Sequence, residues 1–216
     1  MRGDTIIVEQ HHRRAASEIC PVLVQKINDA DGKFAITVAG ESGSGKSETA
    51  TAIAEALEAA GIDAAILQQD DYFVYPPKSN DQARRKDIAW VGPQEVRLDL
   101  MDSHLRAFLD GAESVEKPLV DYDADSIGQE TMDFGAARVA IAEGTYTSLL
   151  DSANVRIFIT RDYEQTRAHR EKRNRDASEL DPFIDDVLKI EHDIISLHRS
   201  RADIVINADF TVNIVT

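Results

Sequence analysis

The chain has 216 residues, of which 43% are hydrophobic and 29% charged, a composition typical of a folded globular domain. Its formal net charge of -15 argues against a nucleic-acid partner, because such proteins carry a basic patch or stripe. No apolar run reaches the length of a membrane span, no signal-peptide core opens the chain, and a single cysteine excludes an internal disulfide. These features predict one cytoplasmic domain over residues 1–216 with no membrane partner, and they leave a homo-oligomer open.

The first segment, from about Thr5 to Asp29, has a helical pattern, which Pro21 either divides or restarts as a second helix. We regard residues 1–32 as an N-terminal helical extension. His11 and His12 are adjacent and point in different directions on a helix, so a solvated helix face is favoured over a metal-binding pair. The buried positions expected here are Ile6, Ile7, Ile19, Val22, Leu23 and Ile27.

The strongest motif of the chain lies between Phe34 and Ser47. Residues 34–38 are apolar or β-branched and predict a buried strand. Residues 40–47 then fit G-x-x-x-x-G-K-[ST], and a helical pattern begins at once. A strand, a glycine-rich loop and a helix in this order predict a phosphate-binding loop (P-loop); a plain flexible turn before a helix is the alternative.

The residue types of this loop suit a nucleoside triphosphate with Mg²⁺. The glycines let backbone N–H groups converge on phosphate, and the following helix adds the positive end of its dipole. Lys46 can reach the β- and γ-phosphates, and the Ser47 hydroxyl can ligate Mg²⁺. The predicted nucleotide-binding residues are Gly40, Glu41, Ser42, Gly43, Ser44, Gly45, Lys46, Ser47 and Glu48.

Carboxylates follow two further predicted strands. Asp70 and Asp71 come soon after a strand over 64–67, and Glu143 directly follows a strand over 137–142. Open α/β sheets bind their ligands at the carboxyl edge of the strands, so these acids are expected near the P-loop. For the Asp pair, an ordinary turn or helix cap is the alternative.

The stretch between residues 74 and 91 lacks a regular pattern and is long for a plain connection, so it predicts a substrate-side loop or lid. Trp90 either anchors this loop or stacks on a substrate, and anchoring is favoured. The remaining expected elements are a helix from Pro93 to Gly111, a hairpin of strands 117–123 and 129–134, strands 155–160 and 202–206, and a helix from 182 to 199.

Three arginines, Arg167, Arg170 and Arg173, are spaced by three in a helix predicted over 162–173, which places them on one side. A solvated basic helix is one interpretation, because charge runs usually face water. In so acidic a chain, a guanidinium cluster favours an anionic partner such as phosphate. We therefore expect a lid helix region at about 161–181.

Taken in order, these parts resemble the uridine kinase and phosphoribulokinase group of P-loop kinases. Residues 69–73, QDDYF, are similar to the group's Q-D-[SD]-[FY]-[FY] segment, and Pro118 followed by Tyr122-Asp123 is similar to its P-x-Y-D segment. Glu143-Gly144 is similar to its E-G after a core strand, and the arginines resemble its lid. The resemblance covers most of residues 34–206.

The resemblance implies an α/β, three-layer P-loop NTPase fold: a central, mostly parallel sheet flanked by helices, with a small acceptor-side insert and an Arg-rich lid. It implies ATP and Mg²⁺ as cofactors and phosphoryl transfer to a hydroxyl of a small metabolite. Asp70, Lys46 and Arg170 would be catalytic, and Ser47 and Glu143 would hold the metal. It further implies nucleotide contacts by Arg167 and Arg173, and substrate contacts by Asp71, Tyr72, Tyr122 and Asp123.

Two interpretations stay open. The segments over 90–97 and 124–128 differ from those that read the base in uridine kinases, so the acceptor is not identified. A nucleotide-gated regulatory or binding module with slow ATP hydrolysis is the alternative to a kinase; it would need no acceptor-side base such as Asp70. A GTPase is disfavoured because the chain has no N-K-x-D guanine signature.

Overall fold

The computed structural model describes residues 6–166 and 181–215. In these ranges the central sheet has six strands in the order β2-β5-β1-β6-β7-β8, parallel throughout except for the last pair. This confirms the predicted mostly parallel sheet. The strands are β1 (Phe34–Gly40), β2 (Ala64–Gln68), β5 (Val139–Glu143), β6 (Val155–Ile159), β7 (Ile204–Ile206) and β8 (Val212–Ile214).

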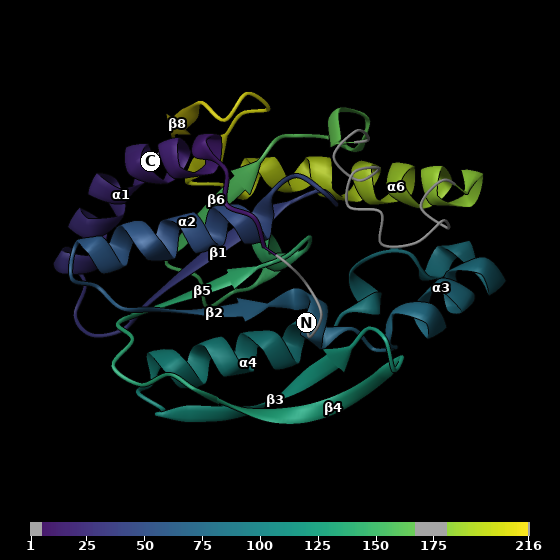
Figure 1. Cartoon of the computed structure of the whole chain (residues 1–216), viewed down its shortest axis with the longest axis horizontal. Helices are drawn as coiled ribbons and strands as arrows, with labels where there is room; N and C mark the ends of the chain where they lie inside the picture. Colours follow the sequence, from purple (N-terminus) through teal and green to yellow (C-terminus); the bar gives the residue numbers. More distant parts are fainter. Residues whose placement is uncertain (1–5, 167–180, 216) are drawn as a thin grey trace.

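Helices cover both faces of this sheet (Figure 1). α1 and α2 pack with one face, and α4 packs with the other, where the end of α6 joins it. α3 lies at the side of the molecule, near the first turn of α6 (Figure 1). The helices are α1 (Gln10–Asp29), α2 (Lys46–Ala59), α3 (Pro77–Lys86), α4 (Leu98–Leu109) and α6 (Pro182–Ile195). Short 3₁₀ turns are η1 (Gln69–Tyr72), η2 (Ile88–Trp90), η3 (Pro93–Glu95), η4 (Thr147–Leu149) and η6 (Ser196–Arg201).

The apolar run of β1 explains why two cores form. All seven residues of the strand are buried. Phe34, Ile36 and Val38 join the core under α1 and α2, whereas Ala35 and Ala39 join the core under α4. A parallel strand covered on both faces needs such a continuous apolar sequence, and its carboxyl end then presents the P-loop at the edge of the sheet.

The N-terminal extension differs from its prediction in three respects. α1 continues through Pro21 as one helix, because its apolar face packs on α2 and outweighs the lost hydrogen bond. Ile6 and Ile7, expected to be buried, are 37% and 66% exposed. His12, expected on a solvated face, is buried, and its ring packs edge-on to Phe210.

The stretch over 74–91 is more regular than predicted, since it contains α3 and η2. α3 has one buried residue, the polar Asn80, so its sequence lacks the apolar periodicity by which a helix is predicted. Trp90 anchors the stretch, as favoured, by donating its indole N–H to Asn80 Oδ1 at 2.9 Å. The helix predicted from Pro93 is divided into η3 and α4.

A separate hairpin of β3 (Ser114–Asp121) and β4 (Ser126–Asp133) forms a two-stranded antiparallel sheet beside α4. The predicted hairpin is thus present, with earlier bounds. The edge strand β8 was not predicted; its three residues form too short a pattern to recognise in the sequence.

Candidate functional site

The P-loop connects β1 to α2 and has the backbone that phosphate binding needs. Gly43 and Gly45 have φ values of 74° and 95°, a region in which only glycine is unstrained. Ser44 Oγ is buried and has no hydrogen-bond partner among the described residues. Lys46 Nζ donates to Glu41 O at 2.9 Å, which folds the lysine back over the loop. A loop of this shape, with an unused donor and an ammonium group, fits a phosphate chain.

The two predicted metal ligands, Ser47 and Glu143, contact each other. Ser47 Oγ donates to Glu143 Oε1 at 2.9 Å, and Glu143 lies at the end of β5, paired with Val38 of β1 and Gln68 of β2. Burial and the nearby Asp70 charge raise the pKa of Glu143 to about 7, against the opposing effects of Lys46 and Ser47. Ser47, Glu143 and Asp70 therefore come together at one edge of the sheet.

Ser47 and Glu143 suit Mg²⁺, which in proteins takes one or two oxygen ligands from the chain and completes its shell with phosphates and water. Within the described part of the chain, no group of three or more His, Cys, Asp or Glu side chains could hold a metal ion by itself. An ion at this position would depend on the nucleotide.

The two neighbouring aspartates differ in their surroundings. Asp70 is half-buried in η1 beside Glu143. Asp71 is buried and holds the hairpin: its Oδ2 accepts from Lys117 Nζ at 2.7 Å, and its Oδ1 accepts from Val120 N at 3.1 Å. Lys117 also lies 2.6 Å from Glu130 Oε1. Asp71 thus has a structural contact that the sequence did not reveal.

The other three predicted substrate residues, Tyr72, Tyr122 and Asp123, differ in their surroundings. Tyr72 has no exposed surface and its hydroxyl is 2.9 Å from His104 Nδ1, so we do not propose the expected substrate contact for it. Tyr122 and Asp123 lie in the turn between β3 and β4, and Asp123 O accepts from Lys78 Nζ at 3.3 Å. The turn is therefore tied to the first turn of α3.

A buried acid of the P-loop makes contacts that sequence reasoning missed. Glu41 Oε2 accepts from Tyr163 N at 2.7 Å, and Glu41 Oε1 lies 2.7 Å from His192 Nδ1 on α6. Burial raises the pKa of Glu41, and the hydrogen bond to Glu41 raises the pKa of His192. We call Glu41, Tyr163 and His192 the P-loop latch. Its members are far apart in the chain, and no sequence pattern links them.

A second missed feature is the Arg84 cluster, which consists of Arg84 on α3, Glu95 in η3 and Glu191 on α6. Arg84 Nε and Nη2 donate to the two oxygens of Glu95, and Nη2 also lies 3.1 Å from Glu191 Oε1. Glu95 has no exposed surface, and Glu191 is 7% exposed. Arg84 is one of several charged residues in a stretch without a regular pattern, and the sequence alone does not distinguish it.

Glu48, the last predicted P-loop residue, is buried in the first turn of α2. The predicted lid arginines, Arg167, Arg170 and Arg173, lie outside the described residues. Across the described ranges, no helix is both long and apolar enough to cross a membrane.

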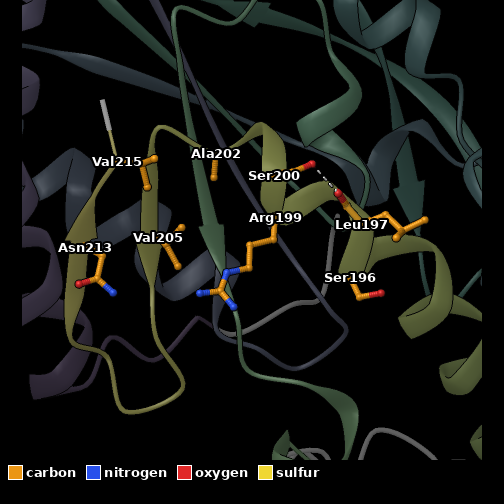
Figure 2. A pocket seen from close by; sticks show the side chains of 8 residues that line it. All are labelled: Ser196, Leu197, Arg199, Ser200, Ala202, Val205, Asn213 and Val215. Atoms are coloured by element: carbon orange, nitrogen blue, oxygen red, sulfur yellow. Dashed lines mark hydrogen bonds between the residues drawn. The ribbon is translucent and has the colours of Figure 1, made fainter.

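A hollow of about 580 Å³ lies beside β7 and β8, the last two strands of the sheet, and is shown in Figure 2. It runs between η6 and the last two strands, with Arg199 pointing between Val205 and Ser196. None of the predicted site residues lines it. We therefore place the candidate active site at the P-loop edge and not here.

A P-loop at the carboxyl edge of a mostly parallel sheet, with an acidic strand end beside its serine, defines a P-loop nucleotide-binding α/β protein. Residues 35–212 match the Phosphoribulokinase / Uridine kinase family. The chain belongs to this family of kinases, which confirms the resemblance found in the sequence.

Two curated relatives illustrate the range of the family. The bifunctional alpha-galactosidase/sucrose kinase of Mediterraneibacter gnavus is 29% identical over 203 residues, which are 88% of this chain but only 22% of that protein. The uridine kinase of Staphylococcus epidermidis is 28% identical over 186 residues, which are 79% of this chain and 86% of that protein.

Solved structures with low identity share the fold. A possible uridine kinase of Bacillus stearothermophilus has a TM-score of 0.61 at 17% identity, covering 89% of this chain and 97% of its own. The D-glycerate 3-kinase of Cryptococcus neoformans also has a TM-score of 0.61, at 10% identity, covering 94% of this chain and 98% of its own. These likenesses concern the fold alone.

Proposed function

We propose that this protein transfers the γ-phosphoryl group of ATP to a hydroxyl of a small metabolite. The observation that carries the proposal is the meeting of Ser47, Glu143 and Asp70 at the P-loop edge. Its family and its curated relatives, which include a sucrose kinase and uridine kinases, support a kinase with a hydroxyl-bearing acceptor.

In this proposal each residue has a defined task. The P-loop N–H groups and Lys46 hold the triphosphate and stabilise the charge that develops on it. Asp70 aligns the acceptor hydroxyl and accepts its proton. Ser47 and Glu143 hold Mg²⁺, which when bound supplies positive charge to the phosphates. Arg167, Arg170 and Arg173 are expected to close over the nucleotide, with Arg170 contributing to catalysis.

Acceptor-stimulated ADP release tests the proposal. The purified chain is given ATP and Mg²⁺ with a panel of sugars, polyols and nucleosides, and ADP is followed in a coupled assay. At least one acceptor should stimulate release, and Lys46→Ala should lower the stimulated rate by at least about 10²-fold, because its charge acts on the migrating group.

Thermal melting of Lys46→Ala checks that the fold is intact. If no acceptor stimulates wild-type ADP release and slow hydrolysis alone is seen, the nucleotide-gated module replaces the kinase. Near-normal turnover by a folded Lys46→Ala variant would show that the P-loop is misassigned.

A further inference from the structure

The turn that follows β5 is attached to the strand that presents the P-loop. It covers residues 143–147 and begins with Glu143, the predicted metal ligand; we call it the Glu143 turn. Gly144 N donates to Val38 O at 3.0 Å, and Thr147 Oγ1 donates to the same oxygen at 3.1 Å. Val38 lies in β1, two residues before the P-loop begins. The Glu143 turn and the P-loop are therefore held together by direct hydrogen bonds.

Gln69 attaches the Asp70 segment to the same turn. Its amide oxygen Oε1 accepts from Tyr146 N at 2.6 Å. Its side chain also packs against Gly144, where an added Cβ atom would lie 2.2 Å from Gln69 Cβ. Side-chain carbons do not approach so closely, so this contact requires that residue 144 be glycine. One side chain thus makes both a hydrogen bond and a close packing contact with the Glu143 turn.

Asp70 lies between two residues whose side chains are held in place. Gln69 is 1% exposed and Asp71 is 2% exposed, whereas Asp70 is half-buried. Asp71 bonds to Lys117 and to the backbone of β3, so it ties η1 to the hairpin. Gln69 ties η1 to the Glu143 turn instead. Of these two contacts, it is that of Gln69 which connects Asp70 to the metal side of the site.

The amide of Gln69 is used at its oxygen end. Tyr146 N is a donor, so the atom that it contacts is assigned as the amide oxygen. The nitrogen, Nε2, is buried and has no hydrogen-bond partner among the described residues. Burying such a nitrogen costs free energy, which an apolar side chain of the same size would avoid. The presence of an amide therefore favours the bond to Tyr146 N, and not packing alone, as the task of this residue.

We propose that Gln69 is a positioning residue, which sets the place of the Asp70 carboxylate relative to Glu143 and the P-loop. This inference rests on the proposed kinase function and adds a residue to it. Phosphoryl transfer needs the acceptor hydroxyl in line with the γ-phosphate, and a misplacement of about 1 Å can lower the rate by about 10²-fold. Asp70 aligns the hydroxyl, the P-loop and Glu143 serve the phosphate, and Gln69 fixes the distance between them.

Gln69→Met tests the inference, because methionine has a similar length but lacks the amide oxygen that accepts from Tyr146 N. With ATP, Mg²⁺ and a saturating acceptor from the ADP-release panel, kcat should fall by about 10- to 10²-fold. Calorimetry with a non-hydrolysable ATP analogue and Mg²⁺ should give an affinity within about threefold of wild type, since the P-loop is unchanged. A fall in kcat without a fall in nucleotide affinity is the expected sign of lost positioning.

A double-mutant cycle shows whether Gln69 acts through Asp70. In an Asp70→Asn background, Gln69→Met should lower kcat by no more than about twofold, because the carboxylate to be positioned is already absent. A general structural role would lower kcat by the same factor in both backgrounds, since the two effects would then be independent. Equal factors would therefore overturn the inference.

Asn154→Leu is the matched control for stability. Asn154 Oδ1 accepts from Ala35 N at 2.8 Å, so this amide oxygen also pairs with a backbone N–H, but near the start of β1 and away from the P-loop. Both variants leave a backbone N–H without its partner and should lower the melting temperature. Asn154→Leu should keep the wild-type kcat, which separates a loss of position from a loss of stability.

Thr147→Val is the second variant, in case Gln69→Met does not fold. Valine keeps the shape of threonine but lacks the hydroxyl, which bonds to Val38 O and Gly144 O at 3.1 Å each. The Glu143 turn should then be held less firmly to β1, and kcat should fall by about three- to tenfold. This fall should again shrink in the Asp70→Asn background.

The outcomes separate this inference from the kinase proposal. If an acceptor stimulates wild-type ADP release but Gln69→Met and Thr147→Val keep the wild-type kcat, the inference is wrong although the kinase remains. If no acceptor stimulates ADP release by the wild-type protein, the kinase proposal fails and this inference fails with it.

Discussion

The P-loop edge and the Arg84 cluster are built in different ways. The P-loop edge is one continuous run, residues 40–48, completed by Glu143 at the end of a neighbouring strand. The Arg84 cluster collects side chains from segments far apart; Arg84 bonds to Glu95 across 11 positions and to Glu191 across 107. The P-loop edge is mostly local in the sequence, whereas the cluster exists only after folding.

The difference follows from which groups make the contacts. A P-loop binds phosphate largely through backbone N–H groups, and a strand, a glycine loop and a helix are enough to present them. The Arg84 cluster consists of side chains, whose partners depend on how α3, η3 and α6 pack together. The P-loop can therefore be recognised from a motif, but the cluster is found only in the structure.

The largest expected effect is at Asp70, which lies in η1 beside Glu143 at the P-loop edge. Asp70→Asn should lower kcat by roughly 10²–10⁴-fold, the contribution of a well-placed general base, while the affinity for an ATP analogue stays the same. Turnover at saturating acceptor and calorimetric binding of the analogue measure the two effects separately.

Asp71→Asn is the matched control, with the same chemical change one residue later. Its turnover per folded molecule should stay within a few-fold of wild type, because Asp71 is engaged with Lys117 and the backbone of β3. An inactive Asp71→Asn variant together with an active Asp70→Asn variant would mean that the general base is Asp71 and not Asp70.

The sequence was informative where a local pattern carries the structure. The buried run of β1, the glycine loop and the acid at the end of β5 were all predicted, because each depends on neighbouring residues. α3 was missed because its buried face is the polar Asn80, and the continuity of α1 through Pro21 was missed because packing on α2 decides it. Local helix propensity does not include how a helix packs in the fold, so it predicts neither feature.

The Glu41–His192 and Arg84–Glu191 contacts were missed for a related reason. Each joins side chains across more than a hundred positions, and a single sequence holds no signal of such pairing. The acidic residues can be read from the sequence, but the side chains that pair with them cannot be predicted from it. The roles of the predicted site residues stay predictions, and so does the lid, whose arginines lie outside the described residues.

A smaller effect is expected from Asp71→Asn, on stability and not on catalysis. Asp71 and Lys117 are both buried, so removing the carboxylate charge leaves Lys117 with Glu130 as its remaining charged partner. The free energy of unfolding should fall by about 1–3 kcal/mol, the cost of weakening a buried, charged hydrogen bond. Denaturant melts measure it, and Asp123→Asn, at an exposed position in the hairpin turn, offers a comparison. Unchanged stability would show that the hairpin is held by its other contacts.

The smallest expected effect concerns the P-loop latch and its dependence on pH. The hydrogen bond and charge of Glu41 raise the pKa of His192, with further help from Asp162 and Asp193 and against partial burial. The protonated imidazolium is thus favoured in the folded state. Its contribution is complete below the unfolded pKa of about 6.5 and is lost as the pH rises through the raised folded pKa.

Loss of that proton should loosen Glu41 and the P-loop that contains it. The KM for ATP should therefore increase by roughly two- to fivefold as the pH rises through this window, an effect limited by the partial exposure of the pair. His192→Gln keeps a hydrogen-bonding group but does not titrate, so its KM should be flat over the same range. His198→Gln is the control, because His198 bonds to Ser148 and not to the P-loop. If His192→Gln retains the wild-type pH profile, the latch does not govern nucleotide binding, and the hydrogen bonds of Glu41 are structural only.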